Sequence, residues 1–510
     1  MDTFISITDA LWEPLAYVAL GFGLLITIVT KGLVFRRFPD MMRGLFENKL
    51  SSNGTSSFQA LMITLADRVG VGNIAGVAIA VFAGGPGALF WMFISTVLGT
   101  GTALSETILG QVYKRKIDGE YRGGVPFYIE HGLKLRWLGI AVAFIFIAAY
   151  AVFVPGLQAN SVTVSIESAF SIPTWATGAF LVGALGLIAL GGTKRIVKVC
   201  QVVVPILGLL YLGFALWIVA INFSQFGAVF TMVFGAAFGY DAVFGAMLGT
   251  AVAWGIRRAT HSTGTGFGEL AFASSSAAVS HPVKQGMVQA FSSVASICVA
   301  MATGAMLLMT DSYNVTDGSG GFLVNNLQDV EAGPGYTQEA INAVIPGFGP
   351  GFVAIAILFF AFTTLVGYTY ILQTNVAYIS GRTKGPLMWI VTIVLLSSVF
   401  YGSVISAEFI WSVGDFGFAV TTWVNLAVNL ILIPVVIKTV RDYDKQKNMG
   451  LDPVFDPECL GITGATYWEE FNRERKLAEK AGKETLPEKP AAEETAAEPV
   501  TPTPVGKAES

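Results

Sequence analysis

Gly70, Gly72 and Asn73 lie in the apolar run Leu65–Trp91, and their types and spacing suit the binding of a polar ligand and an ion. Together with Gly76 they place three glycines within seven residues, and each glycine weakens a helix by about 1 kcal/mol relative to alanine. In lipid, a broken helix is tolerated only where its freed backbone lines a cavity or meets other protein. Freed carbonyls can hold a cation, and freed N–H groups can face an anion. The stretch therefore predicts a discontinuous membrane helix around a small-molecule and ion site.

Two structural explanations compete with this binding site. Gly72 and Gly76 are four residues apart, a spacing typical of a helix-packing face in membranes. The charged neighbours Asp67 and Arg68 also fit a position at the membrane surface. Asn73 favours the binding site, because an amide side chain in an apolar run needs hydrogen-bonding partners.

Two further polar groups fall inside apolar runs. Gln158 follows Pro155 and Gly156, which weaken the helix where the amide could turn inward, although simple interhelical hydrogen bonding explains it equally well. The adjacent hydroxyls of Thr363 and Thr364 suit a hard cation. Most membrane threonines, however, only bond back to their own helix.

The other intramembrane polar residues are open to more than one interpretation. Tyr368 shares a helical face with Thr364, four residues earlier. Glu106 is either functional or a paired carboxylate, and Asp415 fits a packing role. Asp241, with the glycines around it, marks either a second broken helix or the entry to a span.

Catalytic and nucleotide-binding patterns do not emerge from the sequence. The glycine repeat Gly264–Gly268 lacks the preceding strand and the following Lys-Ser/Thr of a nucleotide loop, so we interpret it as a flexible cytoplasmic loop or gate. We find no nucleophile–base set and no metal-ligand spacing, so we expect no enzyme. No basic patch with interleaved aromatics indicates nucleic-acid binding.

The composition indicates a polytopic, all-α membrane protein. The chain of 510 residues is 53% hydrophobic and only 13% charged, against about 25% charged residues in soluble proteins. A window of roughly 20 residues predicts about eleven spans. The expected spans are Leu11–Thr30, Phe58–Phe82, Ala88–Tyr113, Leu138–Ser161, Thr174–Leu190, Val199–Asn222, Phe234–Ile256, Gly286–Thr310, Gly347–Ile379, Met388–Tyr401 and Glu408–Lys438.

Basic connections alternate with connections that are poor in Lys and Arg, which predicts the orientation by the positive-inside rule. The basic set is Lys31–Lys49, Lys114–Arg122, Lys194–Lys198, Arg257–Arg258, Arg382–Lys384 and Lys438–Lys447. The connection Asp311–Ile345 contains neither Lys nor Arg. We therefore expect the basic set and the C-terminus in the cytoplasm and the N-terminus outside, in the inner membrane of a bacterium.

Several short motifs in order resemble the alanine or glycine:cation symporter family. They are VGVGNIAGVA from Val69, GGPGALFWM from Gly84, SET at Ser105–Thr107, QANS at Gln158–Ser161, HPVKQG at His281–Gly286, and Trp411…Asp415 followed by Asn425-Leu426. Each motif alone is weak, but their common order over about residues 55–440 makes the set specific.

The resemblance implies a LeuT-like fold, a 5+5 inverted repeat with one extra N-terminal helix. It implies an extra helix and basic loop over residues 1–50, and repeats over 51–225 and 226–445. A cytoplasmic tail would follow over 446–510. The tail composition, rich in Ala, Glu, Lys and Pro, predicts disorder after about residue 469.

The resemblance also implies two sites. Sodium ligands would be the backbone carbonyls near Ala66 and Val69, with the hydroxyls of Thr363 and Thr364. Substrate contacts would be Asn73, Gln158 and Tyr368, with the backbone N–H groups around Gly70 and Gly72 taking the amino-acid carboxylate. This set is consistent with hard oxygen ligands for a hard cation and helix-end dipoles for an anion.

This sequence departs from the family pattern at several positions. Thr263 and Gly264 replace an Asn-Glu pair, and Glu269 stands where a small residue is usual. The segment Ser293–Ser296 lacks the acid of a Phe-Ile-Asp-Thr motif, and Tyr368 stands where tryptophan is frequent.

We therefore expect a sodium-coupled symporter that imports a small neutral amino acid, alanine or glycine, by alternating access. Its partners would be the amino acid, sodium and the lipid bilayer, with no cofactor beyond the co-transported ion. One alternative is a proton-coupled or different-substrate carrier of the same fold, with Glu106 or Glu269 as the protonated group. The other is a transporter-like receptor without flux.

Overall fold

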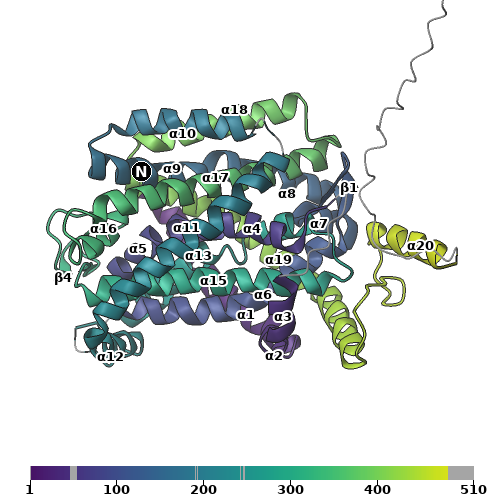
Figure 1. Cartoon of the computed structure of the whole chain (residues 1–510), viewed down its shortest axis with the longest axis horizontal. Helices are drawn as coiled ribbons and strands as arrows, with labels where there is room; N and C mark the ends of the chain where they lie inside the picture. Colours follow the sequence, from purple (N-terminus) through teal and green to yellow (C-terminus); the bar gives the residue numbers. More distant parts are fainter. Residues whose placement is uncertain are drawn as a thin grey trace, which may run out of the picture.

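The computed structural model describes residues 2–45, 54–189, 191, 193–241, 243–244 and 247–480, and it shows an elongated helical bundle (Figure 1). Eight helices in this part of the chain are long and apolar enough to cross a membrane. The elements are α1 (Asp2–Val29), α2 (Leu33–Arg36), α3 (Phe38–Leu45), α4 (Ser57–Arg68), η1 (Val71–Asn73), α5 (Ala75–Gly84), α6 (Gly87–Val112), β1 (Arg115–Ile117), β2 (Glu120–Arg122), α7 (Val125–Gly132), α8 (Arg136–Ala148), η2 (Ala149–Phe153), α9 (Pro155–Phe170), α10 (Thr174–Ala189), α11 (Thr193–Ile221), η3 (Phe223–Gln225), α12 (Phe226–Ala237), α13 (Leu248–Thr263), α14 (Glu269–Ser275), α15 (Pro282–Met309), β3 (Asn314–Thr316), β4 (Phe322–Asn325), α16 (Pro334–Asn342), α17 (Gly349–Ser380), α18 (Pro386–Val404), α19 (Ala407–Asn448) and α20 (Thr466–Lys480).

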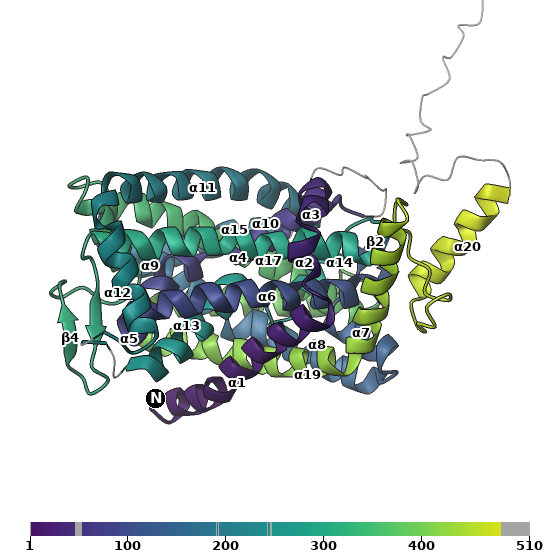
Figure 2. The ribbon, with the colours of Figure 1, turned by 90° about the horizontal axis from the view of Figure 1, so that it is seen from below.

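The two ends of the bundle carry different elements. The antiparallel hairpin β3–β4 lies with α12 and α16 at one end, here called the β3–β4 end. The hairpin β1–β2 lies with α7 and α20 at the other, here called the α20 end. Helix α1 begins at the β3–β4 end and runs toward the α20 end, where the last described helix, α20, lies (Figure 2).

The first predicted break is present between α4 and α5. Ser56 caps α4 with a capping box, in which its hydroxyl accepts from the Gln59 N–H at 3.1 Å and the Gln59 side chain accepts from the Ser56 N–H at 3.0 Å. The helix ends at Arg68, because Gly70 is extended (φ −138°, ψ −155°). The short η1 then leads into α5, so the apolar run is one discontinuous helix.

A second break lies between α13 and α14, and the sequence interpretation of this region was wrong. Gly264, Gly266 and Gly268 have positive φ angles of 56°, 96° and 86° and are buried inside the bundle, so they are not a cytoplasmic loop. The expected span Phe234–Ile256 is divided, because α12 ends at Ala237 and α13 begins at Leu248. The Asp241 region is therefore a connection between two helices and not the break.

Arg257 and Arg258 also lie elsewhere than expected. Both belong to α13 and are buried in the bundle. They are therefore not part of a basic loop, and the loops that determine orientation are fewer than the sequence suggested.

The two breaks are held against each other by one side chain of α15. The Ser296 hydroxyl lies 3.0 Å from Asn73 Oδ1 and 2.6 Å from the carbonyl oxygen of Ser262. Gly72 packs so closely on α13 that a Cβ there would lie 3.1 Å from Ser262 Cα. The packing explanation for Gly72 is therefore correct, and it holds together with the helix break.

The segment after α19 folds back onto the α20 end of the bundle. Trp468 is fully buried, and its indole N–H donates to the carbonyl of Gln111 at 2.8 Å. The ammonium of Lys114 lies 4.5 Å from the centroid of Tyr467 and 5.2 Å from that of Trp468. The boundary expected near residue 469 falls inside α20, and residues 481–510 lie outside the described part of the chain.

Replacing Trp468 by alanine should release this segment. The change removes a buried indole, which costs about 3–5 kcal/mol where the surroundings do not collapse. Amide hydrogen exchange over residues 465–472 should accelerate roughly hundredfold or more. The exposed Leu477, changed to alanine, is the matched control and should leave exchange unchanged. Equal protection in both variants would show that Trp468 does not hold the segment.

Candidate functional site

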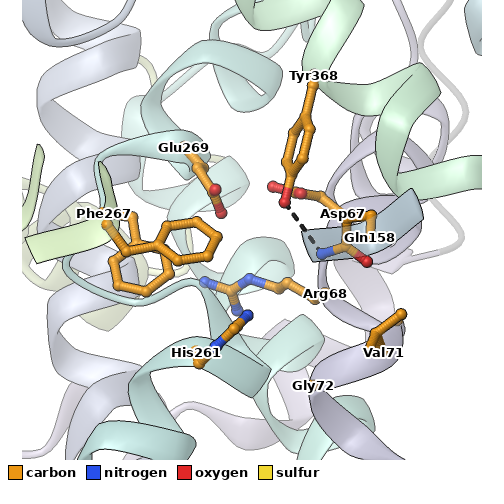
Figure 3. A pocket seen from close by; sticks show the side chains of 11 residues that line it. Asp67, Arg68, Val71, Gly72, Gln158, His261, Phe267, Glu269 and Tyr368 are labelled. Carbon is orange, nitrogen blue, oxygen red and sulfur yellow. Dashed lines mark hydrogen bonds between the residues drawn. The ribbon is translucent and has the colours of Figure 1, made fainter. Parts of the chain in front are cut away.

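A cavity of about 250 Å³ lies where the two breaks meet. Seven helices and the two connections at the breaks contribute to its wall, and Figure 3 shows how the side chains converge on it. The lining residues are Asp67, Arg68, Gly70, Val71, Gly72, Gln158, His261, Phe267, Glu269, Tyr368 and Phe418. Of the expected substrate contacts, Gly70, Gly72, Gln158 and Tyr368 therefore meet at one cavity.

The expected sodium ligands lie beside this cavity. The Thr364 hydroxyl donates to the Ala66 carbonyl at 2.9 Å, joining the end of α4 to α17. Thr363 bonds to the Phe360 carbonyl of its own helix at 2.9 Å. Val69 is the C-cap residue that directly follows α4. A Cβ on Gly70 would lie 2.8 Å from Thr364 Oγ1, so the glycine leaves room for that hydroxyl.

Gln158 and Tyr368 contact each other across the cavity wall. The Gln158 amide donates to the Tyr368 hydroxyl at 3.3 Å (Figure 3). The other amide atom, Gln158 Oε1, is buried and lacks a hydrogen-bond partner among the described residues. An acceptor is therefore free at the cavity.

Asn73 has a different place from the other expected substrate contacts. Its side chain is buried, and Nδ2 donates to the Arg68 carbonyl at 2.8 Å. Its Oδ1 accepts from Ser296. Asn73 thus ties the chain on both sides of the first break and does not line the cavity.

Charged side chains line the cavity, and the sequence did not predict them in its wall. Asp67 and Glu269 lie within hydrogen-bonding distance of each other. The Arg68 guanidinium extends into the space below Glu269 (Figure 3). These residues are therefore not at a membrane surface, and the only sequence signal for Glu269 was its departure from the family pattern.

Arg68 is held by serines of α15. Its Nη1 lies 2.7 Å from the hydroxyls of both Ser292 and Ser293. Its Nη2 is buried and lacks a partner among the described residues. The serines of α15, in the segment without the acid of the Phe-Ile-Asp-Thr motif, thus position the Arg68 guanidinium and leave one of its N–H groups without a partner.

Glu106 supports the second break from behind the cavity. Its Oε1 accepts from the Gly266 N–H at 2.8 Å and from Asn425 Nδ2 at 2.7 Å. Asn429 extends this buried network through Asn425 and Ser105. Glu106 is therefore hydrogen-bonded through one oxygen, while its buried Oε2 lacks a partner among the described residues.

A buried ion cluster closes the β3–β4 side of the cavity. Asp415 of α19 contacts Arg257 at 2.9 Å and also pairs with Arg258. Arg257 contacts Asp9 of α1 at 2.8 Å, and Trp12 donates to the Asp415 carbonyl at 2.9 Å. The extra N-terminal helix thus takes part in this closure.

The α20 side is closed by a smaller group. Arg122 of β2 donates to Thr374 at 2.9 Å and to Glu120 at 2.7 Å. Its guanidinium lies 5.5 Å from the ring centroid of Tyr370 on α17. The cavity is therefore closed toward both ends of the bundle.

Residues 1–457 match the protein family described as the sodium:alanine symporter family. The chain belongs to this family. It is 41% identical over 446 residues, 87% of this chain and 100% of the relative, to the "Sodium/proton-dependent alanine carrier protein" of Bacillus sp. (strain PS3). It is 35% identical over 456 residues, 89% of this chain and 92% of the relative, to the "Probable sodium/glutamine symporter GlnT" of Bacillus subtilis (strain 168).

The fold of this symporter is shared with a solved structure, that of MhsT in complex with L-phenylalanine. The TM-score is 0.54 at 14% identity, over 77% of this chain and 93% of MhsT. This confirms the LeuT-like fold expected from the sequence. The chain is thus a multi-pass membrane transporter, an amino-acid:cation symporter and not an enzyme.

Breaking the ion cluster should destabilise the symporter. In Asp415→Asn the two buried guanidiniums lose their shared carboxylate, and breaking a buried pair costs about 3–5 kcal/mol. Asp9→Asn is the matched control: it removes only a half-exposed partner of Arg257, worth about 0–1 kcal/mol. Thermal unfolding of the purified protein should show a clear loss for Asp415→Asn alone. Equal midpoints would contradict a structural role for the cluster.

Proposed function

We propose that this symporter imports a small neutral amino acid, alanine or glycine, together with sodium. The observation that carries the proposal is the contact of Thr364 with the Ala66 carbonyl, directly beside the cavity. A helix-end carbonyl and a hydroxyl are ligands that a hard cation prefers. The rings of Phe267, Phe418 and Tyr368 wall the cavity, which favours a small substrate.

Coupling follows from the adjacency of the two sites. Sodium, bound by Ala66, Val69, Thr363 and Thr364, would hold the end of α4 against α17. That contact fixes Gly70 and Gly72 in the cavity wall, where their backbone can meet the amino acid. Each ligand thereby stabilises the arrangement that the other needs, which is the requirement for population shift.

We place the β3–β4 end outside and the α20 end in the cytoplasm of a bacterial inner membrane. The hairpin connection Asp311–Ile345 contains neither Lys nor Arg, whereas Lys114–Arg122 is basic. In the closed state described, the Asp415 cluster and the Arg122 group separate the cavity from both sides. Alternating access would open them in turn.

A proton-coupled carrier is the second candidate. It is favoured by the name of the relative from strain PS3, which includes both sodium and proton, and by the buried carboxyl group of Glu106. Uptake driven by a pH gradient in the absence of sodium would distinguish it from the sodium symporter.

Labelled alanine uptake into proteoliposomes tests the proposal. An inward sodium gradient should drive accumulation that potassium does not support. An inside-negative potential of about 100 mV should raise it up to roughly fifty-fold for one net charge. Uptake that is equal in sodium and potassium would refute sodium coupling.

Two glycines of the first break provide a matched pair of variants. Gly70→Ala should reduce sodium-driven uptake at least about tenfold, because its Cβ would displace the Thr364 hydroxyl. Gly76→Ala adds the same atom one turn later, where the nearest atom is 3.9 Å away, and should leave uptake within about twofold. Full sodium-driven uptake by Gly70→Ala would contradict a cation site at the contact of Thr364 with Ala66.

A further inference from the structure

The carboxyl pair Asp67 and Glu269 lies where two cavities meet. The first is the substrate cavity described above. A second, of about 280 Å³, is lined by residues that include Ile63, Thr64 and Tyr370, and it also contains Asp67, Arg68 and Glu269 in its wall. Any ligand in the substrate cavity is therefore bounded by these three charged groups.

Asp67 and Glu269 lie within hydrogen-bonding distance of each other, as two carboxyl groups that share one proton do. In a nonpolar interior, two adjacent carboxylates are unfavourable unless a proton or another cationic group lies between them. An ammonium group that enters the cavity can take the place of that proton.

Unpartnered polar atoms show where the rest of the ligand would lie. Arg68 Nη2 is a buried donor and Gln158 Oε1 a buried acceptor, and neither has a hydrogen-bond partner among the described residues. Both belong to side chains that line the same cavity. Val71 and Gly72 begin η1, so their N–H groups have no acceptor within that helix. Donors for an anion thus lie close to acceptors for a cation.

We infer that Asp67 and Glu269 bind the α-ammonium group of the amino-acid substrate, with Gln158 Oε1 as a third acceptor. The substrate carboxylate is then directed to Arg68 Nη2 and the N–H groups of Val71 and Gly72. The inference rests on the proposed transport of an amino acid. It assigns the residues that bind the ammonium group and the carboxylate of that amino acid.

An ammonium group fits this place better than a second metal ion. It has three donors, which matches one acceptor each from Asp67, Glu269 and Gln158. Among the described residues, no group of three or more His, Cys, Asp or Glu side chains is placed to hold a metal ion. Acceptors for the ammonium group together with donors for the carboxylate also select a zwitterion over simple acids or amines.

Glu269 is held in place for this role. The Tyr150 hydroxyl donates to Glu269 Oε1 at 2.6 Å. A Cβ at position 264 would lie 2.5 Å from Glu269 Oε2. The glycine at 264 therefore leaves room for the carboxylate of Glu269 in this position. Both positions are among those at which the sequence departs from the family pattern.

The test compares alanine with L-lactate, which carries a hydroxyl in place of the ammonium group. Binding of both to purified protein in saturating sodium gives an affinity ratio. Glu269→Gln and Asp67→Asn should lower alanine affinity about 10- to 100-fold, the usual loss for a charged hydrogen bond, with little change for lactate. The alanine-to-lactate ratio should therefore fall at least tenfold.

Glu106→Gln is the matched control, because it neutralises a buried carboxylate that does not line the cavity. It should change both affinities alike and keep the ratio. Tyr150→Phe keeps the ring but removes the hydroxyl that orients Glu269, and should lower the ratio a few-fold without neutralising any carboxylate.

A ratio that Glu269→Gln and Asp67→Asn leave unchanged would overturn the inference. So would a loss of sodium affinity with the ratio preserved, because the pair would then bind the inorganic cation. If the wild type binds no alanine, the proposed substrate fails. The same ratio, measured with whichever amino acid binds against its 2-hydroxy analogue, then still tests the ammonium subsite.

Discussion

The site depends on two interrupted helices that are held together at their interruptions. Ser296 bonds to Asn73 on one side and to the Ser262 carbonyl on the other, while Gly72 allows the two backbones to approach. Backbone groups freed in a membrane must find partners. Here Ser296 of α15 donates to the Ser262 carbonyl and Asn73 donates to the Arg68 carbonyl. The polar groups at the breaks that have no hydrogen-bond partner within the protein are thus the ones available to a ligand.

The buried charged residues around the two breaks differ in how completely they are paired. Asp415, between Arg257 and Arg258, forms a buried ion cluster in which opposite charges are in contact, and none of these three residues lines the cavity. Arg68 is only partly paired, because one of its nitrogens is used by serines and another is not. A charged group held in an ion pair maintains the structure, whereas a guanidinium with an unpaired N–H group is available to a ligand. The buried unpaired donor has a free-energy cost until an acceptor binds to it.

The sequence predicted the first break correctly, because a glycine cluster in an apolar run is a local signal. Gln158 and Tyr368, named from the family resemblance, lie in the cavity wall, and their contact with a substrate stays a prediction. The sequence missed the second break at Gly264–Gly268. There, buried Arg257 and Arg258 made the surrounding segment look like an exposed basic loop, and their partner Asp415 is distant in sequence. Pairing that depends on long-range contacts cannot be inferred from a window of residues.

The N-terminal helix adds a constraint on how the protein is made. Trp12 bonds to the backbone of Asp415, 403 residues later in the chain. At synthesis rates of about 5–20 residues per second, roughly 20 to 80 s separate the emergence of these partners. During that interval α1 is already in the bilayer with Asp9 and Trp12 lacking the contacts they will make. The contact between Trp12 and Asp415 can therefore form only after α19 has been synthesised, and nascent chains stopped before α19 would lack it.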